Sequence, residues 1–209
     1  VAARSRLSLA PERTTIALLP GSRASEVSRL AEPMIEAARL LSARRPEPLQ
    51  FVAAMANERV QEMFRSESER LGFSGIEQVL NNPRTVIAAA DAVMCASGTA
   101  TLEVTLVNRP LVSTYIVNTA SWKLVKYTGL IKPQFFALPN ILAGEELIPE
   151  RVQEQATAEN IAHEINRWLD DREARDSLRQ RFTGLHEQLR CDASARAAEA
   201  VSKLLESRP

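Results

Sequence analysis

Two segments of the chain each combine a glycine with groups suited to binding phosphate. In the first, an apolar run is followed by Gly21, Ser22 and Arg23. A glycine lets the backbone approach a ligand closely, and the planar guanidinium of an arginine carries donors that match phosphate oxygens. Glu26 is expected either to orient Arg23 or to contact the ligand itself. The alternative is a simple turn beside a solvated arginine, because the segment lacks the full pattern of a dinucleotide-binding or Walker A loop.

The second segment places a glycine and hydroxyl side chains at the predicted start of a helix. It contains Ser97, Gly98, Thr99, Ala100 and Thr101. Because the first N–H groups of a helix are free and carry positive partial charge, such a start can hold a diphosphate. Glu103 would lie on the same helix face as Thr99 and could accept hydrogen bonds from the two hydroxyls of a ribose. The alternative is an ordinary capped helix with an exposed glutamate.

A third segment, residues 136–144, carries a polar Asn140 among apolar neighbours. A buried asparagine needs hydrogen-bond partners, which a sugar hydroxyl or the asparagine's own turn could supply. The residues alone favour the turn. Gln153, further along the chain, is open to the same two interpretations.

Aromatic, aliphatic and basic residues are interleaved over residues 122–132. They include Trp122, Lys123, Lys126, Tyr127 and Lys132. This composition suits a membrane interface or an anionic substrate with acyl chains. The alternative is a helix packed on the core whose lysine side chains reach outward to water.

Short apolar runs and helical patterns alternate along the first half of the chain. The apolar runs cover residues 14–19, 49–55, 76–80, 92–96 and 111–115, and the helical patterns cover 25–42, 58–71, 83–90 and 100–107. This alternation predicts an α/β fold, a Rossmann-like open parallel sheet covered by helices on both faces. In such sheets ligands bind beyond the carboxyl ends of the strands, where both glycine segments fall.

The pattern changes after residue 115. We expect an amphipathic helix over 121–130, a loop or short strand over 135–142, and three helices over about 158–169, 172–188 and 193–205. The chain would then divide into a linker at 1–13 that follows a missing N-terminal domain, a nucleotide-sugar-binding domain at 14–155, and C-terminal helices at 156–209.

Composition limits the function classes. Lysine plus arginine and aspartate plus glutamate both number 26, so the net charge is zero and nucleic acid is not expected to be the main partner. No signal peptide is expected, and no apolar run approaches the ~20 residues of a membrane-spanning helix, which predicts a cytoplasmic location. Cys95 and Cys191 are not spaced as metal ligands, and His163 and His186 stand alone, so no metal is expected.

Taken in order, four segments resemble lipid-A-disaccharide synthases. They are residues 18–23 with Glu26 and Val27, residues 96–103, residues 138–144 with Pro149, Glu150 and Gln153, and residues 189–191. The resemblance covers nearly the whole chain from about Ile16 onward. Each motif is weak alone, and their common order makes the resemblance specific.

The resemblance implies the C-terminal, donor-binding half of a two-domain GT-B glycosyltransferase, with the active site in the cleft between the domains. It implies transfer of 2,3-diacylglucosamine from its UDP donor to 2,3-diacylglucosamine 1-phosphate, with inversion at the anomeric carbon and formation of a β-1,6 bond. No metal or other cofactor is implied. The enzyme would work at the inner-membrane surface of a Gram-negative bacterium, on the route to lipid A and lipopolysaccharide, and it could form a homodimer through its C-terminal helices.

On this basis Arg23 and Asn140 are the expected catalytic residues. The expected donor site comprises Gly21, Ser22, Arg23, Glu26, Ser97, Gly98, Thr99, Ala100, Thr101, Glu103, Asn140 and Gln153. Arg23 and the start of the second helix would stabilise the charge that develops on the diphosphate, and Glu103 would hold the ribose. The base that the family is thought to use lies in the expected missing domain, so the resemblance assigns none here.

Two positions depart from the family pattern, since Ile116 and Glu145 stand where relatives commonly have basic residues.

Three other classes of protein share parts of the sequence pattern. They are another UDP-sugar enzyme such as an epimerase, a UDP-binding module without activity of its own, and a scaffold whose C-terminal helices mediate oligomerisation.

Overall fold

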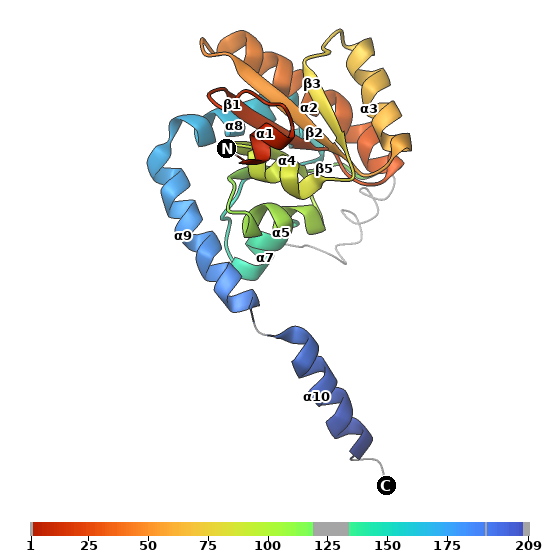
Figure 1. Ribbon diagram of the computed structural model, residues 1–209, viewed down its shortest axis with the longest axis vertical. Coiled ribbons are helices and arrows are strands. Elements are labelled where there is room, and N and C mark those ends of the chain that lie inside the picture. The colour runs from red at the N-terminus through yellow and green to blue at the C-terminus, as the bar shows by residue number, and fades with distance from the viewer. Residues whose placement is uncertain (1, 119–133, 191, 207–209) are drawn as a thin grey trace.

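The computed structural model of the chain describes residues 2–118, 134–190 and 192–206 (Figure 1). In this part of the chain, six parallel strands form one sheet in the order β3-β2-β1-β4-β5-β6. The strands are β1 (Thr14–Leu19), β2 (Leu49–Met55), β3 (Ile76–Leu80), β4 (Ala92–Ala96), β5 (Leu111–Tyr115) and β6 (Glu150–Val152). The first five coincide with the predicted apolar runs, so the predicted α/β class with a parallel sheet is confirmed.

The central strands are apolar on both sides because both faces of the sheet are covered. Ile16, Ala17 and Leu18 in β1 are fully buried, as are Val93 and Met94 in β4. A parallel strand that carries helices on both faces is typically a continuous apolar run rather than an alternating one. The composition of these runs therefore follows from their central place in the sheet.

Helices form a layer on each face of the sheet (Figure 1). On one face, α2 (Ala24–Arg44) packs against both α3 (Glu58–Arg70) and α8 (Ala158–Asp170). On the other, α4 (Pro83–Ala89) packs on β1 to β3, and α5 (Thr99–Leu106) packs on β4 and β5. This arrangement agrees with right-handed crossovers between successive parallel strands.

The covering helices change face between β1 and β4, which are neighbours in the sheet. β1 continues into α2 on one face, whereas β4 continues into α5 on the other. In open parallel sheets such a reversal leaves a crevice beyond the carboxyl ends of the two strands. Leu19 and Cys95 form the last register pair, so the segments that follow them flank this crevice.

One prediction about the second half is wrong. Residues 135–142, expected as a loop or short strand, contain the helix α7 (Leu138–Ala143). Pro139 lies in its first turn, and Gly144 follows its last residue with φ +70°. Proline near the start and glycine just after the end are ordinary helix signals, but the helix is too short to show a helical repeat of apolar residues.

The segment at 1–13, expected as a linker, begins with a short helix, α1 (Ala2–Arg6), that packs against α4. Arg4 donates from Nε to the carbonyl of Ala89 at 2.9 Å and forms an ion pair with Asp91. The same Asp91 carboxylate accepts a hydrogen bond from the backbone N–H of Thr15 at 2.8 Å. These contacts tie the segment to the amino ends of β1 and β4.

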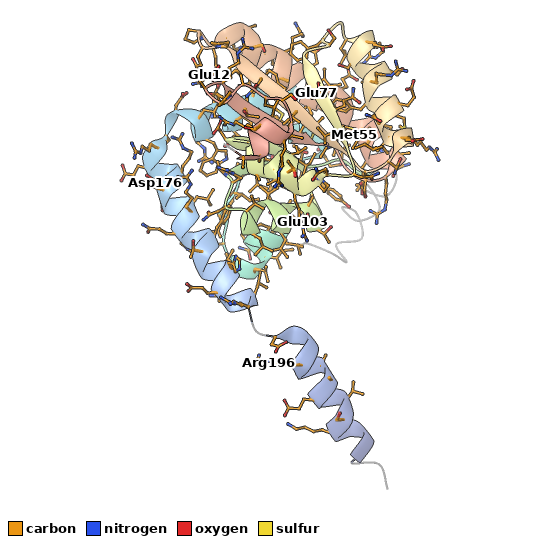
Figure 2. The ribbon with its side chains drawn as sticks, viewed as in Figure 1. Glu12, Met55, Glu77, Glu103, Asp176 and Arg196 are labelled. Atoms are coloured by element: carbon orange, nitrogen blue, oxygen red, sulfur yellow. The ribbon has the colours of Figure 1, made fainter. Side chains whose placement is uncertain are left out.

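The C-terminal helices differ in how they contact the body. α9 (Arg172–Leu189) packs against α5, α7 and α8, while α10 (Ala193–Glu206) extends away from the rest of the chain (Figure 1). Charged side chains such as Glu77 and Asp176 lie on the outer surface, and Arg196 lies on the projecting α10 (Figure 2). Among the described residues, no helix combines the length and apolar character needed to cross a bilayer.

Candidate functional site

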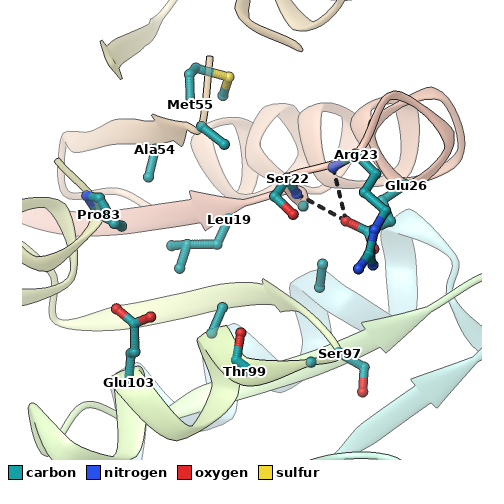
Figure 3. Close-up of a pocket in the computed structure, with 15 residues that line it drawn as sticks. Leu19, Ser22, Arg23, Glu26, Ala54, Met55, Pro83, Ser97, Thr99 and Glu103 are labelled. Atoms are coloured by element: carbon teal, nitrogen blue, oxygen red, sulfur yellow. Dashed lines mark hydrogen bonds and ion pairs between the residues drawn. The ribbon is translucent and has the colours of Figure 1, made fainter. Parts of the chain in front are cut away.

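A pocket of about 400 Å³ opens at the carboxyl ends of β1, β2 and β4 (Figure 3). The predicted site residues that line it are Gly21, Ser22, Arg23, Glu26, Ser97, Gly98, Thr99, Ala100 and Glu103. The two glycine segments, which are far apart in the sequence, therefore form the walls of a single site.

Glu26 organises the loop between β1 and α2. Its Oε2 accepts hydrogen bonds from the backbone N–H groups of Ser22, at 2.9 Å, and Arg23, at 3.1 Å. Its Oε1 accepts a hydrogen bond from the Arg23 guanidinium at 2.8 Å (Figure 3). Of the two roles expected for Glu26, the contact that orients Arg23 is therefore present within the chain itself.

Gly21 makes room for the carboxylate of Glu26. Its φ is +116°, a conformation that residues with a side chain rarely adopt. A Cβ atom at this position would lie only 2.6 Å from both Cβ and Oε2 of Glu26. The sequence predicted that the space left by the absent side chain of Gly21 would be used by a ligand. In the structure the side chain of Glu26 lies in this space.

The start of α5 forms the facing wall of the pocket. Gly98 precedes the helix with φ +147°, and among the described residues no atom beyond the adjoining backbone would lie within 4 Å of a Cβ built there. Thr99 is exposed, and its hydroxyl points toward the pocket (Figure 3). The N–H of Thr101 donates to the carbonyl of Gly98 at 3.2 Å, so the donors that this helix start can offer to an anion are those of Thr99 and Ala100.

Glu103 lies one turn further along α5, and its carboxylate also points toward the pocket (Figure 3). It is half-buried. In Figure 3 Glu103 and Pro83 lie toward one end of the pocket and Arg23 lies toward the other. The pocket therefore places a cation at one end and a carboxylate at the other.

Sequence reasoning missed the apolar wall of the pocket. It is formed by Leu19, Ala54, Met55, Ala56, Pro83 and Ala96. Their side chains lack polar groups, so their chemistry did not mark them as site residues, although Leu19 and Ala96 fall within two of the motifs. The signal that could have found them is topological, because β2 neighbours β1 and its carboxyl end must reach the same edge of the sheet.

Cys95 precedes Ala96, which lines the pocket, near the end of β4, and it is fully buried. Burial, and to a smaller extent the nearby charge of Glu103, raises the pKa of its thiol far above the usual range. The thiol therefore stays protonated at neutral pH. This protonation state excludes Cys95 as a thiolate nucleophile at the site.

Asn140 is not brought into the pocket. It is fully buried, and its Nδ2 donates to the carbonyl of Ile148, at 2.9 Å, and to Oε1 of Glu150, at 2.8 Å. Its Oδ1 accepts from the backbone N–H groups of Leu147, at 2.9 Å, and Ile148, at 3.0 Å. Unlike the predicted donor-site residues that line the pocket, Asn140 therefore uses its side-chain donors and acceptor within the chain itself.

Glu150 links Asn140 to the pocket indirectly, through a chain of hydrogen bonds. Besides Asn140, its carboxylate accepts hydrogen bonds from the backbone N–H groups of Phe136, at 2.8 Å, and Ala137, at 3.1 Å. The carbonyl of Phe136 in turn accepts a hydrogen bond from Oγ of Ser97 at 3.0 Å. Asn140 thus stabilises the backbone that holds Ser97 at the rim of the site.

Two other predicted residues do not line the pocket. Thr101 is fully buried, and its hydroxyl donates to the carbonyl of Gly98 at 2.7 Å. Gln153 accepts a hydrogen bond from the backbone N–H of Val117 at 2.7 Å. Both side chains bind backbone groups of the chain, and neither lines the pocket. The segment at 122–132 lies outside the described residues.

Comparison with known proteins identifies relatives along the whole chain. A family model described as "Lipid-A-disaccharide synthetase" matches residues 1–201. The lipid-A-disaccharide synthase of Xanthomonas campestris pv. campestris (strain 8004) is 42% identical over 209 residues, which are 99% of this chain and 48% of that protein. That of Vibrio cholerae serotype O1 (strain ATCC 39541) is 42% identical over 207 residues, 99% of this chain and 53% of that protein. The chain spans about half the length of the curated relatives it matches.

Solved structures share the fold at low sequence identity. A glycosyltransferase from Rickettsia africae has a TM-score of 0.62 at 11% identity, over 99% of this chain and 52% of that one. ADP-heptose lps heptosyltransferase II of E. coli has a TM-score of 0.55 at 16% identity, over 80% and 50%. A protein from Listeria monocytogenes that is provisionally assigned as a UDP-N-acetylglucosamine 2-epimerase has a TM-score of 0.57 at 15% identity, over 86% of this chain and 42% of that one. These matches confirm the Rossmann-like fold of GT-B glycosyltransferases.

Proposed function

Because the chain belongs to the lipid-A-disaccharide synthase family, we propose that it provides the UDP-sugar-binding half of an inverting glycosyltransferase. The reaction would transfer 2,3-diacylglucosamine from its UDP donor to 2,3-diacylglucosamine 1-phosphate and form the lipid A disaccharide. The observation that carries this proposal is that Arg23, the start of α5 and Glu103 all line one pocket at the carboxyl edge of the sheet.

The diphosphate would lie between Arg23 and the first turn of α5. The helix start supplies free N–H groups and a positive partial charge, and Arg23 supplies a fork of charged donors. Gly98 favours this approach, since in the described part of the chain no atom beyond the adjoining backbone would lie within 4 Å of a Cβ there. As the bond between the anomeric carbon and the diphosphate breaks, negative charge grows on the leaving oxygen, and these donors would stabilise it.

The nucleoside would extend from the diphosphate toward Glu103. A carboxylate accepts two hydrogen bonds readily and so matches the adjacent hydroxyls of a ribose. The apolar wall beyond it, which includes Met55 and Pro83, suits the flat face of a base. This orientation places the sugar end of the donor near Arg23, where the acceptor hydroxyl would attack.

The acceptor and the base that removes its proton are proposed to bind in the part of the relatives that this chain does not span. The attacking 6-hydroxyl would form the new bond on the face opposite the departing UDP, which inverts the anomeric carbon. In this proposal the described residues bind the donor and stabilise the leaving group, and they do not remove the proton.

Binding of UDP to the chain tests the donor-site proposal directly. We expect UDP to raise the melting temperature and to bind with one-to-one stoichiometry by calorimetry, because a ligand that binds only the folded state stabilises it. The substitution R23A should weaken this binding. Absence of any UDP binding by the folded chain would refute the donor-site assignment.

Product analysis distinguishes the proposed transferase from other UDP-sugar enzymes. The chain, joined to the rest of a full-length relative, would be supplied with acylated or unacylated UDP-glucosamine and with 2,3-diacylglucosamine 1-phosphate. Formation of the acylated disaccharide and UDP supports the proposal. Release of an epimerised sugar without an acceptor would favour an epimerase, and UDP binding with no product would favour a binding module.

We further propose peripheral contact with the inner membrane, because the substrates carry acyl chains. Large apolar side chains are exposed on the neighbouring helices α5 and α7, at Leu106, Ile141 and Leu142. The composition of residues 122–132, aromatic, aliphatic and basic, also suits a membrane interface. Sedimentation with anionic liposomes should decrease when Lys123 and Lys126 are replaced by glutamine. Unchanged sedimentation would argue against this contact.

A homodimer through the C-terminal helices is also proposed. α10 extends away from the body, and its Val201 is 55% exposed, which favours a partner for this helix (Figure 1). Analytical ultracentrifugation of the chain and of a version ending at residue 190 tests this proposal. A monomeric full chain would contradict it.

A further inference from the structure

We propose that Glu26, at the amino end of α2, is a positioning residue that holds the guanidinium of Arg23 in place to bind the diphosphate. Its negative charge also directs the phosphates of the ligand to the start of α5. This inference rests on the proposed donor site. It assigns to Glu26 a role in recognising the diphosphate and no contact with the ligand itself.

The loop before α2 is folded around a carboxylate that the chain itself supplies. Glu26 accepts two backbone N–H groups, those of Ser22 and Arg23, and one guanidinium N–H. Gly21 approaches so closely that even a methyl group would collide with Glu26. In nucleotide-binding sheets the turn after the first strand ordinarily offers such N–H groups to a phosphate. Here they are already used by Glu26.

The ion pair between Arg23 and Glu26 contributes little to stability. The Arg23 side chain is 77% exposed, and exposed pairs three residues apart on a helix are weak because water and salt screen them. The ion pair instead restricts the side chain of Arg23, which would otherwise adopt many rotamers. A guanidinium that is already ordered loses less entropy when a ligand binds.

The pair leaves Arg23 able to bind a ligand. The hydrogen bond to Glu26 uses Nη1, and a guanidinium carries five N–H donors in all. Within the described part of the chain, Glu26 is the partner of this guanidinium. The remaining donors can therefore face the pocket while the side chain stays in place.

The carboxylate also determines where the phosphates bind. A phosphate near the backbone of Ser22 and Arg23 would meet a like charge in place of free donors, and such a contact is unfavourable. Over residues 2–118, 134–190 and 192–206, no such carboxylate lies against Gly98 at the start of α5, because nothing there comes within 4 Å of a Cβ built on it. A diphosphate is thus directed to α5 and to the free side of Arg23.

The test compares E26Q with the wild-type chain, because glutamine separates the two functions of Glu26. Its amide oxygen can still accept the backbone N–H groups of Ser22 and Arg23, but it has no charge to hold the guanidinium. By calorimetry we expect E26Q to weaken UDP binding about five- to tenfold, the cost of ordering one long side chain, and to leave uridine binding unchanged. In an R23A background, E26Q should have no further effect on UDP.

The control is E36Q. Glu36 forms the same kind of ion pair with Arg39 three residues along α2, outside the pocket, so its loss should not change UDP affinity. Melting temperatures within about 2 °C of the wild type would show that both variants fold, since a surface pair is worth under about 1 kcal/mol.

The outcomes separate this inference from the proposed function. If the folded wild-type chain does not bind UDP, the donor-site assignment fails and the inference fails with it. If the wild type binds UDP but E26Q binds it equally well, positioning by Glu26 is overturned while the donor site stands. Equal weakening of UDP and uridine, or an effect that adds to that of R23A, would also overturn it.

Discussion

Arg23 and Glu103 line the same pocket, one from the loop that begins α2 and the other from the second turn of α5 (Figure 3). They meet because β1 and β4 pair in the centre of the sheet while their helices leave to opposite faces. A guanidinium at one end and a carboxylate at the other select a ligand with an anion at one end and hydroxyls at the other. The first two predictions follow from this polarity.

Replacing Glu103 by alanine should weaken UDP binding about 10- to 100-fold, because a hydrogen bond to a charged group is worth about 1.5–3 kcal/mol. The same substitution should weaken binding of 2′-deoxy-UDP several-fold less, because this nucleotide lacks one of the two hydroxyls proposed to bind Glu103 and keeps only the 3′ hydroxyl. Calorimetry with both nucleotides measures the difference. E77A, which alters an exposed residue on β3, is the control. Equal loss with both nucleotides would separate Glu103 from the ribose.

Replacing Arg23 by alanine should lower the transfer rate of the complete enzyme about 10²- to 10³-fold, the usual effect of losing one preorganised donor to a developing anion. R23K should recover little of this rate, because a lysine has no planar fork to match two phosphate oxygens. Initial rates at saturating donor measure the effect. Unchanged turnover in R23A would remove Arg23 from the mechanism.

Replacing Asn140 by alanine should destabilise the fold by about 2–4 kcal/mol, because the buried N–H of Ile148 and the partly buried N–H of Leu147 lose their acceptor. Urea unfolding followed by circular dichroism measures this change. At low temperature, where the variant is still folded, UDP affinity should stay within about threefold of the wild type. Normal stability combined with lost UDP binding would restore the direct ligand contact that the sequence suggested.

Replacing Gly21 by alanine should cost at least about 2–3 kcal/mol of stability, since a side chain is strained at φ +116° and would collide with Glu26. It should also weaken UDP binding, because Glu26 must move. Gly72 is the matched control. It has φ +64°, and a Cβ added there would meet no atom within 4 Å, so G72A should cost only about 1–2 kcal/mol and leave UDP affinity unchanged. Similar behaviour of the two variants would contradict the role given to Gly21.

The buried Cys95 should make stability fall at high pH. Burial raises the pKa of its thiol in the folded protein, whereas an unfolded cysteine titrates near pH ~8.5. Above that pH the unfolded chain releases the proton and the folded chain does not, so the free energy of unfolding decreases by up to about 1.4 kcal/mol per pH unit. Urea unfolding between pH ~7 and pH ~10, compared with C95A in a background lacking Cys191, tests the sign. A slope unchanged by C95A would contradict it.

The sheet was predictable from the sequence because its strands are buried on both faces. A continuous apolar run between two turn signals leaves few alternatives, so β1 to β5 were expected within their observed bounds. β6 has only three residues, and α7 only six, so neither is long enough to repeat a pattern. Their positions depend on tertiary contacts such as those of Glu150 with the backbone at 136 and 137.

The polar half of the site was predictable for a different reason. Glycine, arginine and hydroxyl residues after strand ends have a chemical meaning that does not require coordinates. Asn140 shows the limit, because an asparagine that binds a sugar and one that binds its own backbone have the same sequence signature. Met55 shows the opposite limit, since an apolar residue at a strand end carries no chemical mark of the pocket that it lines.

The carboxylate of Glu26 has a consequence for the design of inhibitors. A compound that mimics the donor needs negative charge only where α5 begins, and an added acidic group aimed at the loop before α2 would be repelled. A neutral hydrogen-bond acceptor at that place would gain nothing either, since the amide protons there are already engaged. Screening libraries for this pocket should therefore favour molecules with one anionic centre, a diol and a flat apolar ring.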